Sequence, residues 1–181
     1  MEHDAAMSDS APSLGHFTVH RYLELGDCGL IAPDDRVELL DGIVVAMPPT
    51  SPLHDNAVRR ILYVLLQRLG FETIVRGQST FVCGEDSAPQ PDIAVCPGND
   101  RTHDLRHPTQ AHLLVEVAST SLAQDRLTKS AIYARAGVPC YWIVNLRESC
   151  IEANRTDGGR STARSRGRQT RTASSSTRFP T

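Results

Sequence analysis

Residues 112–118 have the sequence His-Leu-Leu-Val-Glu-Val-Ala, an apolar run interrupted by a single carboxylate, Glu116. Aliphatic and β-branched runs of this length are typical of a buried β-strand. A charge inside such a strand costs free energy unless a cation or hydrogen bonds compensate it. Glu116 is therefore a candidate functional residue, with exposure on an edge strand or a structural ion pair as the alternatives.

A second short strand precedes this one in the chain. Pro91-Asp-Ile-Ala-Val-Cys-Pro97 is bounded by prolines, which the interior of a strand does not tolerate. Asp92 lies at its start, either as a functional carboxylate or as a simple loop-edge residue. If the two strands pair, with residues 97–111 as their connection, Asp92 and Glu116 come together.

The remaining pattern alternates helices and strands and predicts an α/β domain. Asp41-Gly42 joins two apolar runs as a type I′ turn, which predicts a β-hairpin over residues 36–47. Other segments follow from hydrophobic spacing, proline and glycine. We expect helices over residues 18–25, 53–69 and 125–136, and strands over residues 71–75, 79–83 and 140–145.

The chain of 181 residues suits one domain, which we place at residues 16–154. Residues 1–15 form a polar leader that we expect to be disordered. Residues 155–181 are rich in Arg, Ser and Thr with almost no aliphatic side chains, so we expect a disordered tail that cannot offset its ordering entropy.

Composition limits where the chain works and what it binds. No apolar run is long enough for a membrane span, the N-terminus lacks the features of a secretory signal, and the five cysteines contain no CxxC pair. We therefore expect a cytoplasmic protein without membrane partners or structural zinc. Residues 1–150 hold 12 basic and 19 acidic side chains, a net charge of −7, while residues 151–181 carry +5. The negative net charge of residues 1–150 argues against binding a polyanion by charge alone, but it is compatible with carboxylates that a metal ion neutralises.

Two further residues belong with the paired carboxylates. Lys129 is the only lysine among 19 cationic residues, and its compact ammonium can contact a water and a phosphate oxygen together. Its alternative is a chance position on an exposed helical face. Glu38 lies in the first hairpin strand and could supply a third carboxylate, or could face solvent on an amphipathic strand. His54 and Gln78 are weaker candidates, as a first-turn helix residue and a turn residue.

Hard carboxylate oxygens of this kind suit Mg²⁺, with Mn²⁺ as an alternative. A bound divalent ion can polarise a phosphoryl oxygen and activate water, which is the chemistry of phosphodiester hydrolysis. Glycine-rich phosphate loops, G-x-S-x-G elbows and HExxH helices are absent from the sequence. Ser119, Thr120 and Ser121 could contact a phosphate, or could serve as capping and turn residues.

Five segments in order resemble the Uma-type putative restriction endonuclease family of the PD-(D/E)XK nuclease superfamily. They are Val37–Gly42, Pro91–Val95, Leu114–Ser119, Asp125–Lys129 and Tyr133–Val144, and the resemblance covers residues 16–153. It implies a restriction endonuclease-like core, a mixed sheet flanked by helices, with an N-terminal β-hairpin and metal-binding acids. Asp92 matches the motif aspartate, Glu116 the second acid and Glu38 the early glutamate, so all three are expected metal ligands.

The chain departs from that family pattern at three places. The motif lysine position holds Ala118, and the cation is expected to have moved to Lys129 on the following helix. Asn145 stands where the family usually has aspartate. The Arg/Ser/Thr tail replaces further strands and an apolar ending.

The expected function is a Mg²⁺-dependent endonuclease acting on DNA, with Glu38, Asp92, Glu116 and Lys129 as catalytic residues. A homodimer would be the simplest assembly for cutting two strands. The alternative from another class is a catalytically inactive nuclease fold that binds nucleic acid or regulates. A structural or oligomerisation protein is the third hypothesis.

Overall fold

The computed structural model describes residues 15–32, 34–69, 73–99, 101–157 and 160–168. Its helical elements are α1 (Val19–Asp27), α2 (Pro52–Leu69), α3 (Leu122–Gln124), the π-helical turn η1 (Asp125–Lys129) and α4 (Ser130–Arg135). Its strands are β1 (Val37–Leu40), β2 (Ile43–Ala46), β3 (Thr73–Gly77), β4 (Ile93–Pro97), β5 (Leu113–Ala118), β6 (Cys140–Asn145), β7 (Cys150–Asp157) and β8 (Arg160–Arg168).

Six strands form one mixed sheet in the order β3-β4-β5-β6-β7-β8. All neighbouring pairs are antiparallel except β5 and β6, which run parallel. The parallel pair requires a crossover, which α3, η1 and α4 supply between the two strands. The C-terminal end of β5 therefore leads directly into this crossover, near the middle of the sheet.

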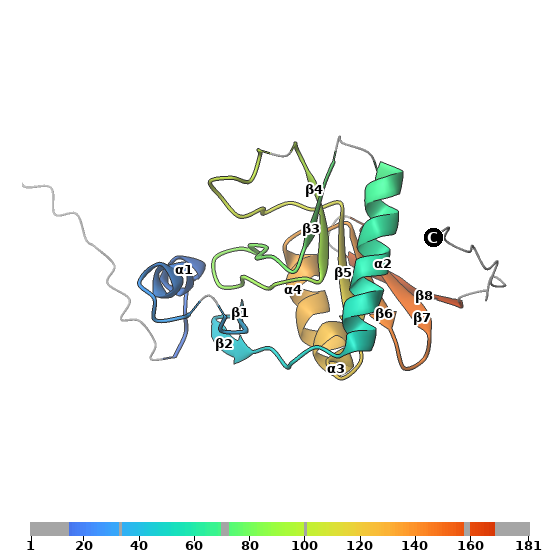
Figure 1. The fold of residues 1–181 in the computed structure, drawn as a ribbon, viewed down its shortest axis with the longest axis horizontal. Helices are drawn as coiled ribbons and strands as arrows, with labels where there is room; N and C mark the ends of the chain where they lie inside the picture. The colour runs from blue at the N-terminus through green and yellow to red at the C-terminus, as the bar shows by residue number, and fades with distance from the viewer. Residues whose placement is uncertain (1–14, 33, 70–72, 100, 158–159, 169–181) are drawn as a thin grey trace, which may run out of the picture.

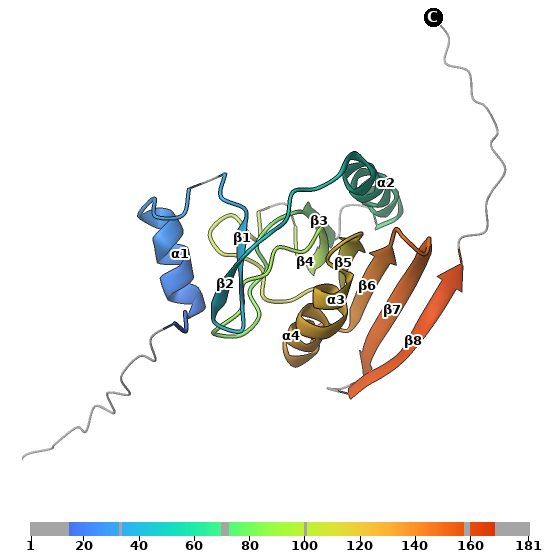
Figure 2. The same cartoon turned by 90° about the horizontal axis from the view of Figure 1, so that it is seen from below.

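Helices cover both faces of the sheet, as Figure 2 shows. Alternate residues of β5 point to opposite faces. Val115 and Val117 pack with Val58 of α2, while Leu114 packs with Ile132 of α4. Glu116 has the same alternation as Leu114 and so belongs to the face of α4. This arrangement confirms the predicted mixed α/β class with helices flanking the sheet.

The β1–β2 hairpin forms a separate two-stranded sheet beside the larger one (Figure 1). Asp41 and Gly42 both have positive φ, 47° and 75°, as the predicted type I′ turn requires. Backbone hydrogen bonds between Leu39 and Ala88 attach β1 to the loop before β4. The hairpin is thus fixed to the segment that leads into Asp92.

We predict that Gly42→Ala destabilises the protein by about 2 kcal/mol, because an L side chain is strained at this φ. A Cβ at Gly42 would also overlap the ring of His16. Gly29→Ala is the matched control, since Gly29 has φ 72° and open space around its Cα. We expect the control to cost about 1 kcal/mol in urea denaturation. Equal losses for the two variants would show that the contact with His16 contributes nothing.

Two local predictions are wrong or shifted. The stretch 79–83 forms no strand and makes only an isolated bridge between Cys83 and Ser87. Its backbone hydrogen bonds go elsewhere, with Phe81 N donating to Pro89 O and Val82 N to Pro108 O. The preceding Gln78 has φ 41°, which turns the chain out of the sheet. Strand β3 begins at Thr73, and residues 70–72 lie outside the described part of the chain.

The sheet continues into residues that the sequence assigns to the tail. β7 extends to Asp157 and β8 covers Arg160–Arg168, paired antiparallel with each other. Backbone hydrogen bonding to β6 and β7 organises these strands, and it does not depend on the aliphatic side chains that the segment lacks. Residues 1–14 and 169–181 lie outside the described ranges, so the predicted disorder of the leader and of the chain's end stays a prediction, as does the domain boundary.

Among the residues that the structure describes, every helix is too short or too polar to traverse a lipid bilayer.

Candidate active site

Asp92 and Glu116 lie side by side because β4 and β5 pair, which is the condition that the sequence left open. Ile93 is opposite Val115 in an antiparallel register, so the next position along places Asp92 opposite Glu116. The Val117 backbone N–H donates a 2.8 Å hydrogen bond to Asp92 Oδ2. The Asp92 side chain therefore continues the hydrogen bonding between β4 and β5, and this fixes the position of Asp92 relative to Glu116.

Glu38 approaches the same point from the β1–β2 hairpin. It is 2% exposed, so it does not face solvent as one reading of the strand allowed. Its Oε2 accepts a 3.1 Å hydrogen bond from the backbone N–H of Gln90, in the loop before Asp92. The Gln90 side chain also donates to Val37 O, which ties this loop to β1 twice.

Lys129 joins Glu38 to Glu116. Its Nζ lies 3.0 Å from Glu38 Oε2 and 3.1 Å from Glu116 Oε1, and the residue is 4% exposed. Tyr133 OH donates a 2.8 Å hydrogen bond to the same Glu116 oxygen. The lone lysine is therefore buried among carboxylates and does not lie on an exposed helical face.

A π-helical turn carries Lys129 and one carboxylate that the sequence analysis did not single out. Asp125 begins η1, is 2% exposed, and accepts a 2.7 Å hydrogen bond from Ser121 Oγ. The Ser130 backbone N–H closes the wide turn by bonding to Asp125 O. Such π-helical turns are frequent at functional sites. The spacing of Asp125 and Lys129, four residues apart on a predicted helix, was the signal available in the sequence.

His54 and Gln78 surround Asp92 on its other side. His54 Nε2 lies 3.1 Å from Asp92 Oδ2, and its Nδ1 lies 3.3 Å from Asp55 Oδ1. Gln78 Nε2 donates to Asp92 Oδ1 over a long 3.5 Å. His54 is held in place because it lies in the first turn of α2, where its backbone N–H donates to Ser51 Oγ. Both weaker candidates thus contact Asp92.

The electrostatics of the cluster favour an added cation. Burial raises the pKa of Glu116 well above its usual range, and the Lys129 ammonium offsets only part of that shift. Burial likewise raises the pKa of Asp125. Burial alone would lower the pKa of Lys129, but the carboxylates of Glu116, Glu38 and Asp125 outweigh it and raise that pKa. The hydrogen bond to Asp92 raises the pKa of His54.

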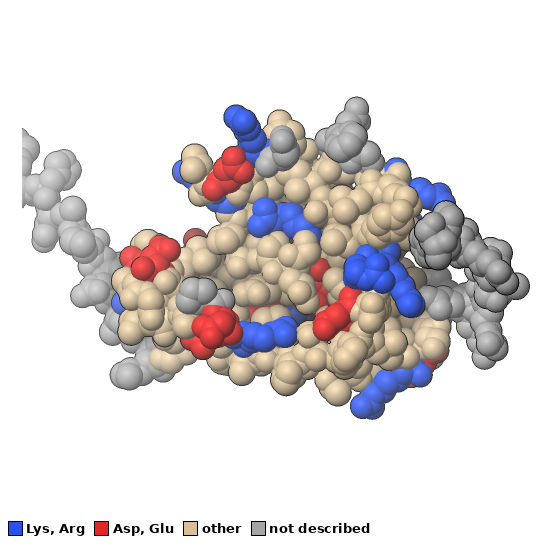
Figure 3. Space-filling view, in the orientation of Figure 1, with Lys and Arg blue, Asp and Glu red and all other residues tan. Residues whose placement is uncertain are grey.

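These side chains line one cavity. Charged atoms of both signs gather around a recess near the hairpin and the start of α2, visible in Figure 3. Its lining includes residues 47–51 and the hydroxyl residues Ser119, Thr120 and Ser121. The cavity therefore exposes hydroxyl donors beside the carboxylates, with Arg36 as a further cation in its lining.

The donor set fits a divalent ion of the Mg²⁺ type. One oxygen of each carboxylate already has partners in the protein. Glu38 Oε2 contacts Lys129 and the Gln90 N–H, Asp92 Oδ2 contacts His54 and the Val117 N–H, and Glu116 Oε1 contacts Lys129 and Tyr133. The second oxygens have no partner closer than the long Gln78 contact among the described residues. Hard oxygens with free lone pairs and a shortage of positive charge are what such an ion requires. Glu38, Asp92 and Glu116 are the residues that would hold it.

Another group of potential ligands lies at the β6–β7 turn. One ligand atom each of Glu148, Cys150 and Glu152 lies within 4.8 Å of the others, a spacing that the three cavity acids do not reach. Arg126 forms an ion pair with Glu152, and Asn145 Nδ2 lies 3.4 Å from the same carboxylate. The Arg126 guanidinium therefore already compensates the charge of Glu152 in this group.

Comparisons with known proteins bear on the fold and the family of this chain. A search of curated proteins finds no match. A solved structure of a putative nuclease belonging to DUF820 from Anabaena variabilis ATCC 29413 is similar, with a TM-score of 0.66 and 13% sequence identity. The similarity covers 84% of this chain and 85% of that one, and at this identity it shows a shared fold.

A family comparison matches residues 19–181 to Uma2, described as putative restriction endonuclease. The match spans the hairpin, both carboxylate strands and the helical segment with Lys129. It also extends through β7 and β8, beyond the range of the resemblance seen in the sequence. The description of this family supports a nuclease. The chain belongs to the Uma2 family of putative restriction endonucleases.

Proposed function

We propose that this protein is a Mg²⁺-dependent endonuclease that hydrolyses phosphodiester bonds in DNA. The observation that carries the proposal is the convergence of Glu38 of β1, Asp92 just before β4 and Glu116 of β5 on one recess, with Lys129 among them. Mn²⁺ would serve as an alternative ion. Cytoplasmic location and DNA as the partner belong to the same proposal, with a homodimer as the assembly for two-strand cleavage.

The ion, when bound, would polarise a phosphoryl oxygen, activate water and offset charge on the leaving oxygen. The chain's own residues orient the reactants. The Lys129 ammonium can contact a phosphate oxygen and the attacking water, because its stem reaches the cavity from η1. Hydroxyl groups of Ser119, Thr120 and Ser121 can donate hydrogen bonds to a phosphate at the cavity wall. Burial of the acids excludes bulk water, which strengthens each of these interactions.

The test is a cleavage assay with the purified full chain. Supercoiled plasmid should be nicked or linearised in Mg²⁺ or Mn²⁺ and remain intact in excess EDTA. Parallel reactions with single-stranded DNA and RNA test the substrate class, and cleavage of RNA alone would reject DNA as the substrate. No cleavage of any substrate, together with no Mg²⁺ or Mn²⁺ binding in calorimetry, would reject the enzyme.

The alternative is an inactive nuclease fold that binds nucleic acid through its basic C-terminal segment. It predicts salt-sensitive DNA binding without metal affinity. Deleting residues 155–181 would remove β8 and the end of β7, so replacing the arginines of residues 160–181 by glutamine is the cleaner test. DNA binding lost in that variant, with no cleavage by the parent chain, would favour this alternative.

A further inference from the structure

The Lys129 ammonium lies between two of the expected metal ligands, Glu38 and Glu116. Its Nζ contacts Glu38 Oε2 at 3.0 Å and Glu116 Oε1 at 3.1 Å. The two carboxylates belong to strands of different sheets, Glu38 to β1 and Glu116 to β5, and the ammonium lies between them. Since both glutamates and the lysine are almost fully buried, water screens this three-residue contact weakly.

The three acids must move closer together before they can share one small divalent ion. Oxygens that share one Mg²⁺ at about 2.1 Å lie no more than about 4.2 Å apart. Among the described residues, Glu38, Asp92 and Glu116 do not bring one oxygen each within 4.8 Å of the others. A shared ion therefore requires the carboxylates to draw closer together, and its charge would repel the ammonium that already contacts Glu38 and Glu116.

Asp92 is held independently of Lys129. Its Oδ2 is fixed by the Val117 N–H and lies beside His54, and no ion pair joins it to the lysine. Glu116 also keeps the Tyr133 hydroxyl, and Glu38 keeps the Gln90 N–H. Movement of the lysine therefore leaves each acid with at least one hydrogen-bond donor, so that the ligands remain oriented.

We propose that Lys129 is the counter-ion of the metal-free site and that a divalent cation competes with it for Glu38 and Glu116. The inference rests on the proposed function, because it assigns the ion to these acids. Metal entry releases the ammonium toward the cavity, where it becomes available to phosphate. The four-carbon stem allows this shift without displacement of the backbone. Lys129 thus weakens metal binding and stabilises the protein when no ion is bound.

Lys129→Met tests the competition, since methionine keeps an unbranched side chain and lacks the charge. Calorimetric titration with Mn²⁺ should show at least tenfold tighter binding than the wild type. The metal-free variant should melt at a lower temperature, because Glu38 and Glu116 then repel without a counter-ion. Addition of Mn²⁺ should raise its melting temperature by more than it raises that of the wild type.

Arg135→Gln is the matched control. Arg135 lies on α4 and pairs with the exposed Asp41, outside the cavity lining. The substitution changes net charge by the same amount as Lys129→Met. Metal affinity should therefore stay at the wild-type value, which separates local competition from the charge of the whole protein.

Each outcome decides the inference. Equal or weaker Mn²⁺ binding by Lys129→Met, with normal binding by the wild type, overturns it and leaves the nuclease proposal intact. No Mn²⁺ binding by the wild type contradicts the metal site of the proposed function itself. If Lys129→Met unfolds without metal, refolding in Mn²⁺ supports the competition. Failure to refold in Mn²⁺ overturns it, because the ion must be able to replace the ammonium.

Discussion

Glu116→Gln is expected to lower the rate of metal-dependent cleavage by about a thousandfold or more while the protein stays folded. Each tenfold loss corresponds to about 1.4 kcal/mol, and metal-assisted charge stabilisation supplies several kcal/mol of transition-state energy. An amide at this position removes the charge that draws the ion to β5. Plasmid cleavage under single-turnover conditions measures the loss.

The fold should survive this substitution because the site already disfavours a charge there. Burial raises the pKa of Glu116 well above its usual range, so a neutral amide avoids that cost. The amide oxygen can still accept hydrogen bonds from Tyr133 OH and Lys129 Nζ. Circular dichroism and the melting temperature should therefore stay close to those of the wild type.

Glu24→Gln is the control for Glu116→Gln. Glu24 lies on the exposed surface of α1, beside His20, and outside the cavity lining. This variant should cleave at the wild-type rate. Wild-type cleavage by a folded Glu116→Gln protein would remove Glu116 from the reaction and move the search for ligands to Asp92, Glu38 and Asp125.

Local patterns in the sequence predict most of the elements that carry the candidate site. The Asp41-Gly42 turn, the helix ending at Leu69 and the strand of residues 140–145 occur where expected. The two carboxylate strands pair with each other, which meets the condition set for bringing Asp92 and Glu116 together. These features depend on short-range signals such as turn glycines, proline boundaries and hydrophobic spacing, and a single sequence contains all of them.

The contacts that complete the site depend on tertiary structure and are harder to predict. Gln90 binds Glu38 through its backbone N–H, which almost any residue could supply. Tyr133 resembles an ordinary core residue of a helix, yet its hydroxyl reaches Glu116. The sequence shows Asp125 only as an acidic residue near Lys129 on a predicted helix. The functional roles of Glu38, Asp92, Glu116 and Lys129 stay predictions, which the variants above test.

The C-terminal segment shows a different limit of sequence reasoning. Its composition predicts disorder because few side chains can be buried. The structure pairs β7 with β6 and β8 with β7 through the backbone, where composition carries little information. Edge pairing of this kind requires a neighbouring strand that is already in place, and the pattern of the segment alone cannot reveal it.

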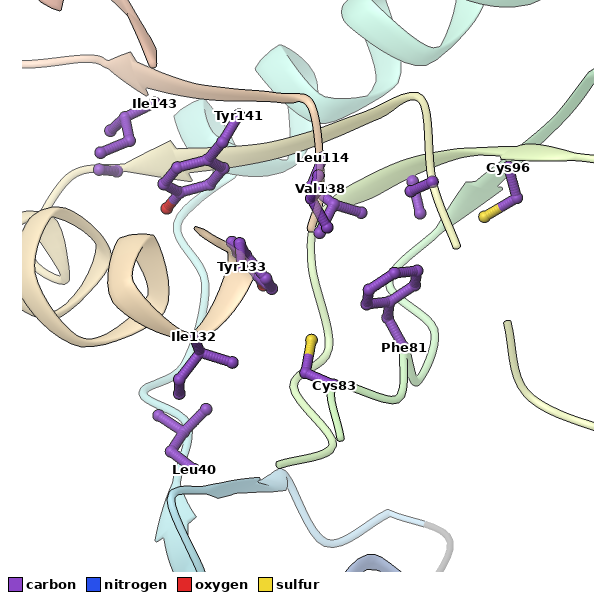
Figure 4. Close-up of a cluster of buried hydrophobic side chains, with 13 residues drawn as sticks. Leu40, Phe81, Cys83, Cys96, Leu114, Ile132, Tyr133, Val138, Tyr141 and Ile143 are labelled. Atoms are coloured by element: carbon purple, nitrogen blue, oxygen red, sulfur yellow. The ribbon is translucent and has the colours of Figure 1, made fainter. Parts of the chain in front are cut away.

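Phe81→Ala is expected to lower the free energy of unfolding by about 3–5 kcal/mol, the usual cost of emptying a phenylalanine site in a core. Phe81 is 0% exposed and lies in the cluster shown in Figure 4, with Leu40, Tyr133 and Leu114. These side chains come from the hairpin, α4 and β5. Against a typical domain stability of about 5–15 kcal/mol, the loss is large. Equilibrium urea denaturation measures it.

Tyr63→Ala is the control, since Tyr63 carries an aromatic ring on the outer face of α2 and is 60% exposed. Its removal should change stability by no more than about 0.5 kcal/mol. Equal effects of the two substitutions would contradict the packing of Phe81 in the core.

The Phe81 variant also separates two explanations of how the site is held together. Phe81 does not line the cavity, but its cluster joins β1 and β5, which carry Glu38 and Glu116, to α4, which directly follows Lys129. If core packing sets the distances among these residues, Phe81→Ala should weaken Mn²⁺ binding under conditions where the variant is folded. Unchanged affinity would mean that local hydrogen bonds, from Gln90 to Glu38 and from Val117 to Asp92, are sufficient to position the acids. The variant thus measures how far the geometry of the site depends on a side chain that never touches it.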